Sequence, residues 1–262
     1  MHAFSTCFLA LYLAHLVTDF MLQPERLVTA KRRGFPRAYA EHGSIHLLSA
    51  LAFLGFAVPG LWKSLAFYLS TLALTLVHLA MDWAKIRLLQ SGRIEDGTAA
   101  FLWDQFFHFL TVGFAAWPIA RPSLLTVASN LRWLQLTIEK PLLVLVVYLA
   151  VIFGGGYLVR FLTRPLLKRD LPDLGETPDE MQNAGMYIGW LERFVVLTAL
   201  LLQSPATVGL ILTAKSIARY PEMKSVRFAE YFLIGTLLSM SIGMLGGLLL
   251  LKAFYGTISL SR

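Results

Sequence analysis

Eight apolar segments alternate with polar stretches along the chain and predict helices that cross or enter a membrane. They lie at residues 3–22, 39–58, 62–86, 98–119, 141–162, 184–203, 205–218 and 228–254. Most approach the roughly 20 apolar residues that span a bilayer as a helix. We therefore expect an all-α fold, a polytopic membrane helix bundle with about eight transmembrane or membrane-embedded helices.

The only long hydrophilic stretch, 163–183, is rich in proline and charge and is typical of a linker. It separates an N-terminal membrane domain at 1–162 from C-terminal membrane helices at 184–262. Basic residues gather between alternate segments, which indicates a multi-pass protein with a cytoplasmic linker and both termini external. The 3–22 segment has no preceding basic region and no convincing cleavage site, so we expect a retained span.

The composition supports the prediction of a membrane protein and argues against nucleic acid as a partner. Hydrophobic residues make up 56% of the chain and charged residues 15%, against about 25% charged in soluble domains. The net charge of +7 comes from basic loops, and no basic face with interleaved aromatics remains to favour nucleic-acid binding. Cys7 is the only cysteine, which excludes disulfides within the chain and thiolate metal sites.

Four of the apolar segments carry two residues of metal-ligand type four positions apart, a histidine with an aspartate in three of them and two histidines in the fourth. Such residues share one face of a helix, with their Cβ atoms roughly 5–6 Å apart. Under the predicted topology, all four pairs lie within about two or three turns of the cytoplasmic loops. We therefore expect one polar cluster, built from His15 and Asp19, His42 and His46, His78 and Asp82, and Asp104 and His108.

This set of residues favours a metal centre. A single histidine in a span reads equally well as a hydrogen-bonded packing residue, but ionisable groups within a membrane are costly and normally paired or functional. Zinc takes three or four nitrogen and oxygen ligands, so the set suits two or three divalent ions. We expect zinc, with manganese or iron as alternatives, and carboxylates that bridge neighbouring ions.

Three residues are candidates for catalytic roles beside such a centre. Asp104 and Glu41 are candidates for the general base or the acid that protonates a leaving group. Lys85 shares a helical face with His78 and could neutralise a phosphate. The structural alternatives are a loop lysine at Lys85 and a helix N-terminal charge at Glu41.

The second half of the chain contains no histidine and predicts a scaffold. Glu192 and Arg193 favour a structural ion network at the start of an apolar run. Small residues at strict four-residue spacing predict close helix packing, within the chain or in a homo-oligomer. These are Gly235, Ser239, Gly243 and Gly247.

The motifs resemble a bacterial membrane family. HLVTDFMLQ at 15–23, HGSIH at 42–46 and HLAMDWAK at 78–85 resemble the domain-of-unknown-function 3307 family. The later stretches IGWLERFVVLTALL, AKSIARYPE and FAEYFLIGTLLS resemble the region that often follows that domain. The family carries no established activity, and the resemblance implies a location in the bacterial inner membrane.

A more distant similarity concerns the pairs themselves. Histidine and aspartate four apart on apolar helices are similar to motifs in membrane-bound metal-dependent hydrolases of bacteria and, through them, in the zinc-dependent phospholipase C group. This similarity implies that the four pairs are metal ligands. The other phospholipase ligands, including its N-terminal amine, have no match in this chain.

The sequence thus predicts an integral membrane metal-dependent hydrolase that acts on a phosphate ester, lipid-linked, at the cytoplasmic leaflet. One alternative is a transporter for a divalent cation or a proton, since intramembrane histidine and aspartate also serve such pathways. Against it, the polar groups gather at one depth. The other alternative is a structural membrane protein stapled by a metal.

Overall fold

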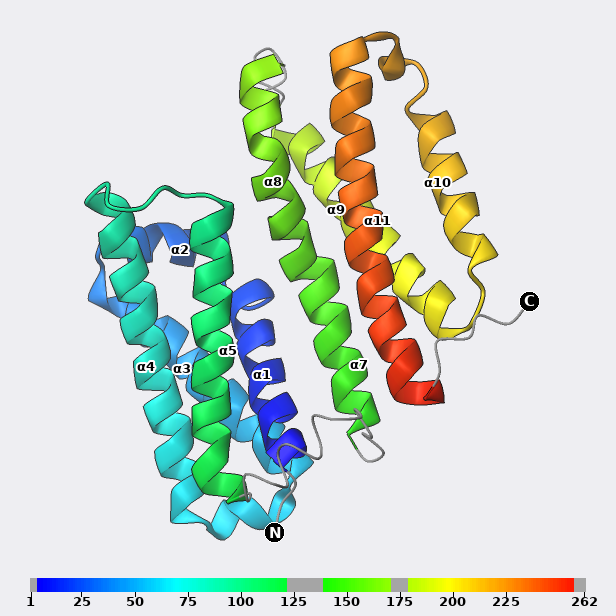
Figure 1. The fold of residues 1–262 in the computed structure, drawn as a ribbon. Helices are drawn as coiled ribbons and strands as arrows, with labels where there is room; N and C mark the ends of the chain where they lie inside the picture. Colours follow the sequence, from blue (N-terminus) through cyan, green and yellow to red (C-terminus); the bar gives the residue numbers. More distant parts are fainter. Residues whose placement is uncertain (1–3, 122–138, 171–178, 257–262) are drawn as a thin grey trace. The chain divides into compact units, whose positions relative to one another are not determined.

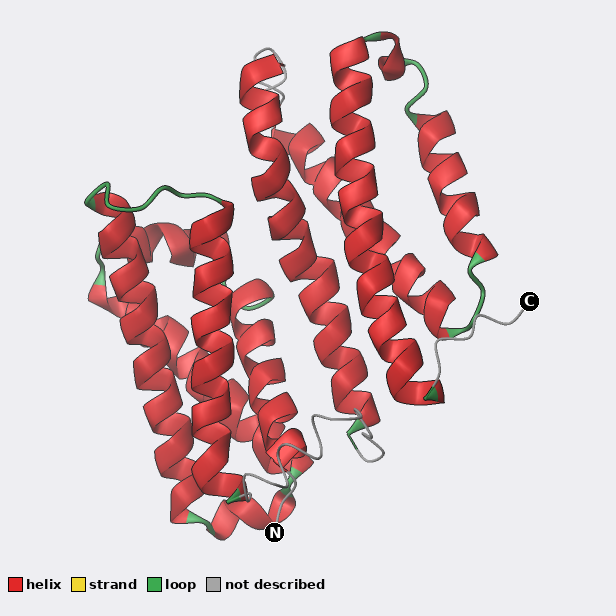
Figure 2. Ribbon diagram, viewed as in Figure 1, coloured by secondary structure: helices red, strands yellow, loops and turns green. Residues whose placement is uncertain are grey.

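The computed structural model describes residues 4–121, 139–170 and 179–256, and within these residues it contains helices and connections but no strand (Figure 2). The expected all-α class is therefore confirmed. The chain forms two compact units, one within Met1–Val146 and the other within Val147–Arg262. The units divide inside a helix, earlier than the predicted linker, whose residues 163–170 are helical and whose residues 171–178 lie outside the described residues.

The first unit is a four-helix bundle (Figure 1). Its members pack in a closed ring, α1 on α3, α3 on α4, α4 on α5 and α5 on α1. They are α1 (Phe4–Phe20), α3 (Pro36–Ala57), α4 (Leu65–Gln90) and α5 (Thr98–Ala120). Short connections make consecutive helices antiparallel neighbours.

Two short elements complete this unit. Helix α2 (Glu25–Arg32) lies against α3 and α4, and the 3₁₀-helix η1 (Pro59–Lys63) joins α3 to α4. The connection from α2 to α3 uses Gly34 with a φ of 80°, a conformation that glycine adopts without steric cost. Pro36 then opens α3, where its missing N–H needs no partner and its fixed φ already suits a helix.

The bundle interior is apolar towards one end and polar towards the other. Ala10, Ala14, Ala50 and Ala116 are fully buried, and such small side chains let helices approach closely. Nearer the other end of each helix, histidine or aspartate residues take the inward positions. The change occurs on all four helices, so the polar positions form one layer of the bundle.

The second unit packs α11 (Val226–Tyr255) against α8 and α9, and α10 against α9. Its other elements are α7 (Lys140–Leu149), which begins in the first unit, the π-helix η2 (Ala150–Gly154), α8 (Gly155–Asp170), α9 (Asp179–Leu201), α10 (Ala206–Ala218) and the 3₁₀-helix η4 (Glu222–Lys224).

Buried Arg193 donates twice to the Ile152 carbonyl, at 3.1 and 2.8 Å, and once to Ser239 Oγ at 3.0 Å. Glu192 accepts from Lys215 at 2.8 Å and so links α9 to α10. These contacts link elements within the second unit.

The small-residue stripe of α11 packs within the chain. Ser239, Gly243 and Gly247 are buried, and a Cβ added at Gly243 would lie 3.0 Å from Cγ1 of Val196 on α9. A Cβ at Gly247 would collide with Leu200 on the same helix. The small-residue face of α11, which the sequence predicts to pack closely against another helix, therefore packs against α9.

The expected count of about eight spans is not supported. Among the described residues, three helices are long and apolar enough to cross a membrane, Leu65–Gln90, Lys140–Leu166 and Val226–Tyr255. The pair of α1 and α2, bent by 85°, would make a fourth if it forms one broken span. Helices α3 and α5, whose apolar runs are interrupted by His42 and His46 and by Asp104 and His108, are not among these three. Helix α10 has only 13 residues, about 20 Å of helix against a core of about 30 Å.

Candidate metal centre

The polar layer of the first unit brings together all eight histidines and aspartates of the four pairs. Each pair faces the bundle interior from its own helix: α1, α3, α4 or α5. The five histidines are at most 1% exposed, and the three aspartate side chains are 10–13% exposed. The cluster is therefore withdrawn from solvent, and its groups depend on one another for charge and hydrogen bonds.

Four atoms from three helices lie at the separations expected of ligands around one ion. His42 Nε2 and His78 Nε2 are 2.9 Å apart, and Asp19 Oδ1 lies 3.5 and 3.3 Å from them. Asp82 Oδ2 lies 3.5 and 3.9 Å from the same two nitrogens. Two ligand atoms of a tetrahedral zinc site, each about 2.0–2.1 Å from the ion, are about 3.3–3.4 Å apart.

A second group of possible ligands lies beside the first. His108 Nε2 is 3.6 Å from Asp82 Oδ1 and 3.6 Å from Asp104 Oδ1. Asp82 thus presents one oxygen to each group, the arrangement of a carboxylate that bridges two metals. One nitrogen each of His15, His78 and His108 also lies within 4.8 Å of the others, and His15 Nδ1 is 3.7 Å from Asp19 Oδ2.

The hydrogen bonds of Thr75 assign the tautomer of His46. The single proton of Thr75 Oγ1 goes to the Thr71 carbonyl at 3.0 Å, so the 3.0 Å contact with His46 Nδ1 makes this nitrogen the donor. His46 Nε2 then carries a lone pair, and it is buried without a hydrogen-bond partner among the described residues. A histidine fixed through one nitrogen, with the other free to bind, is the usual form of a metal ligand.

Several other polar atoms of the cluster also lack a hydrogen bond within the described part of the chain. They are His15 Nε2, Asp19 Oδ1, His42 Nδ1 and His108 Nε2. A buried polar atom without a partner is costly and calls for an explanation such as a bound ion. The donor set of neutral nitrogens and carboxylate oxygens fits zinc, and it also suits manganese or iron.

Two lysines reach the cluster. Lys85 Nζ is 2.8 Å from Asp104 Oδ2, so this lysine lies at the cluster, where it could contact a bound phosphate. Lys31 Nζ is 2.5 Å from Asp82 Oδ2 and also donates to Gln23 Oε1 at 3.2 Å. Sequence reasoning missed Lys31, which reads as one of several basic loop residues, yet it is only 3% exposed. Its spacing of four from Leu27, the other buried residue of α2, places both residues on one helix face but does not indicate that this face is buried.

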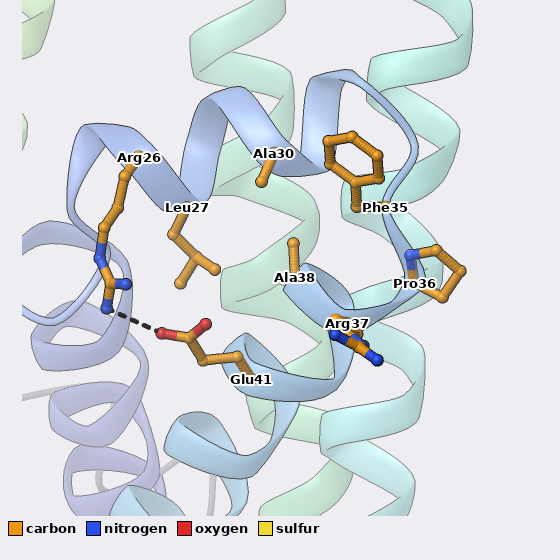
Figure 3. A pocket seen from close by; sticks show the side chains of 8 residues that line it. All are labelled: Arg26, Leu27, Ala30, Phe35, Pro36, Arg37, Ala38 and Glu41. Atoms are coloured by element: carbon orange, nitrogen blue, oxygen red, sulfur yellow. Dashed lines mark hydrogen bonds and ion pairs between the residues drawn. The ribbon is translucent and has the colours of Figure 1, made fainter.

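Glu41 lies outside the cluster. Its carboxylate is 45% exposed and pairs with Arg26 at 3.1 Å on the surface between α2 and α3 (Figure 3). The neighbouring His42 faces the interior, and one residue on a helix turns the side chain by about 100°. The structure therefore does not bring Glu41 to the position of a general base, whereas Asp104 and Lys85 lie at the cluster.

Comparison with known proteins gives one match. A family model described as "Protein of unknown function (DUF3307)" matches residues 7–138. This region holds all of α1 except its first three residues and continues through α5, with all four pairs, Lys31 and Lys85. No curated protein and no solved structure matches the chain.

Proposed function

This chain belongs to the family of proteins of unknown function DUF3307, and we propose that its polar cluster is the metal centre of an integral membrane hydrolase. One observation carries the proposal. Asp19, His42, His78 and Asp82, from three helices, place two carboxylate oxygens 3.3–3.9 Å from two imidazole nitrogens that are themselves 2.9 Å apart. Hydrogen bonding alone leaves five buried nitrogen and oxygen atoms of the cluster without partners among the described residues.

The bundle is suited to the chemistry of hydrolysis. A bound divalent metal lowers the pKa of its water to about 7 and polarises a phosphoryl oxygen. Asp19 and Asp82 would hold such an ion, and Asp82 extends its second oxygen towards His108. Asp104, 3.6 Å from His108 Nε2 and paired with Lys85, is placed to accept and return a proton.

The location of the cluster supports a lipid-linked phosphate ester as substrate. Residues 15–19, 42–46, 78–82 and 104–108 lie at the end of the bundle where α2 packs. This end carries Arg26, Arg32, Arg33 and Arg37, and basic segments flank membrane helices on the cytoplasmic side. In this proposal the bundle lies in the bilayer, and α2 lies along its cytoplasmic interface, at the depth of the lipid headgroups.

Metal analysis and hydrolysis of a defined lipid test the proposal together. Purified protein is expected to hold divalent metal, with zinc the first candidate, and to release phosphate from phosphatidic acid in nanodiscs. Asp82→Asn should lower both the metal content and the activity. Asp96→Asn, at a 39% exposed surface aspartate, is the matched control and should lower neither. Purified protein that contains no metal, and whose melting temperature does not change in chelator, would rule out the proposed hydrolase function.

A second function is favoured by the contacts between the histidines. His42 Nε2 contacts His78 Nε2 at 2.9 Å, and His78 Nδ1 contacts His108 Nδ1 at 3.1 Å. Three imidazoles linked through both nitrogens of the middle ring form a relay along which a proton can move, as in membrane pumps and transporters. Proton flux into proteoliposomes that is lost in His78→Gln, in protein without metal, would support this function over hydrolysis.

A further inference from the structure

Helix α2 covers the polar end of the bundle and inserts one cation into it. The chain bends by 85° between α1 and α2, and Gln23 lies within the bend. Leu27 and Lys31, four residues apart on α2, are the residues of this helix that are buried. Because they share one face, Leu27 packs on the bundle while Lys31 extends its ammonium to the cluster.

The ammonium of Lys31 and the proposed ion share one oxygen atom. Lys31 Nζ lies 2.5 Å from Asp82 Oδ2, the same oxygen that lies 3.5 Å from His42 Nε2 and 3.9 Å from His78 Nε2. Two cations on one carboxylate oxygen repel each other strongly in a medium of low dielectric constant. If Asp82 held a metal ion, the ammonium of Lys31 would leave this oxygen and would stay nearby because α2 holds it.

Formal charge indicates what the displaced ammonium then meets. Asp19, Asp82 and Asp104 contribute three negative charges, and Lys31 and Lys85 contribute two positive charges, which leaves −1. One divalent ion changes this total to +1, and two change it to +3. A phosphate dianion together with one hydroxide carries −3, so two ions with these ligands would make the buried centre neutral. Buried charges need such compensation.

We propose that Lys31 and Gln23 form an anion subsite beside the metal centre, and that this subsite receives the phosphate group of the substrate. The inference rests on the proposed function, because metal binding at Asp82 frees the ammonium. Lys31 donates to phosphate oxygens as a point charge. The Gln23 side chain, now 3.2 Å from Nζ through its oxygen, offers an amide N–H as a second donor.

A neighbouring pocket suits the rest of a phosphate ester. It has a volume of about 520 Å³ and opens between α2 and the start of α3 (Figure 3). Leu27 and Ala30, which line it from α2, lie one turn before and directly before Lys31. Arg37 adds positive charge and Phe35 adds an apolar wall, while Arg26 is paired with Glu41, which also lines the pocket. This lining, in which two arginines and apolar groups accompany one carboxylate, matches an anionic headgroup joined to a hydrocarbon chain.

Orthophosphate binding to the full chain in phosphatidylcholine nanodiscs tests the subsite. Metal-loaded wild type is expected to bind orthophosphate, and chelator-treated protein is not. Lys31→Met should weaken orthophosphate binding by about tenfold or more, the value of one charge-assisted hydrogen bond. Its metal affinity should stay equal or rise, because a competing cation is gone. Lys63→Met, at an exposed lysine of η1, is the control for loss of one charge.

Two further experiments distinguish the subsite from misfolding and identify the source of the phosphate. Lys31→Arg keeps the charge and should retain orthophosphate binding, which separates a lost subsite from a misfolded bundle. Phosphatidic acid in the nanodisc should compete with orthophosphate if the phosphate comes from a lipid headgroup, and leave it unaffected if the source is soluble. Metal-loaded Lys31→Met with wild-type affinity for orthophosphate would overturn the subsite alone. Wild type that binds no metal would overturn the subsite and the proposed function together.

Discussion

Lys85 Nζ lies 2.8 Å from Asp104 Oδ2, and the other oxygen of this carboxylate lies 3.6 Å from His108 Nε2. Lys85 thus supplies a positive charge to Asp104 from α4, while Lys31 supplies one to Asp82 from α2. Because each lysine contacts a different aspartate, their removal should affect different parts of the centre.

Lys85→Met is expected to destabilise metal-free protein by about 1–3 kcal/mol, because it leaves Asp104 without its cation. The value lies below that of a fully buried pair because Lys85 is 30% exposed. Added zinc should reduce the loss, since the ion supplies positive charge at the same carboxylate. Chemical unfolding with and without zinc measures both effects. An equal loss in the two conditions would mean that no ion reaches Asp104.

A chelator should lower the melting temperature of the wild type. Metal that binds only the native state stabilises it by about 2.7 kcal/mol at a hundred times its dissociation constant, or roughly 5–10 °C for a chain of this size. His78→Ala removes a residue that contacts Asp19, His42 and His108. Its melting temperature should therefore hardly respond to chelator, whereas Asp96→Asn should respond like the wild type. If chelator lowered the melting temperature of His78→Ala as much as that of the wild type, His78 would not be a metal ligand.

Much of this cluster could be predicted from the sequence because its pairs obey helical periodicity. His15 and Asp19, or His78 and Asp82, must share a helix face wherever a helix forms. Their interruption of apolar runs marks that face as the interior of the bundle. The common depth followed from counting residues to the basic loops, and the structure places all eight side chains in one layer.

Lys31 and Glu41 could not be assigned in this way. Whether a residue of a short polar helix is buried depends on the 85° bend that lays α2 on the bundle, and periodicity does not encode that angle. Glu41 adjoins a cluster histidine in sequence, but it faces Arg26 on the surface. The expected span count is not supported, and α3 and α5, which carry cluster residues within their apolar runs, are not among the three helices that are long and apolar enough to cross a membrane.

Substitutions at two ligands of one set should be strongly non-additive. Asp19→Asn and His42→Ala each remove an atom from the group that also contains His78 Nε2. Once the first substitution has weakened metal binding, the second removes a ligand from a site that already binds metal poorly. We therefore expect a coupling energy of about 0.5–3 kcal/mol between the two substitutions in the presence of metal. Arg193→Met with His42→Ala is the control, because these residues belong to different compact units. Additive losses for Asp19 and His42 would indicate independent polar pairs.

Gly243→Leu should destabilise the second unit through overpacking. A Cβ at this position would lie 3.0 Å from Val196 Cγ1 and 4.0 Å from Arg193 Cγ, so a leucine must push α11 away from α9. Extra methylene groups in a packed interior cost about 1–3 kcal/mol, and a shift of Arg193 would also weaken its bonds to Ile152 and Ser239.

The matched control is Gly209→Leu on α10, where an added Cβ meets no heavy atom within 4 Å. This exposed helical position should accept leucine without loss, since leucine favours a helix more than glycine does. Yield of folded protein and denaturant midpoints in detergent compare the two variants. Equal stability of Gly243→Leu and Gly209→Leu would mean that α11 does not pack against α9 through its small residues. Metal content should be unchanged in both variants, because the cluster lies wholly in the first unit.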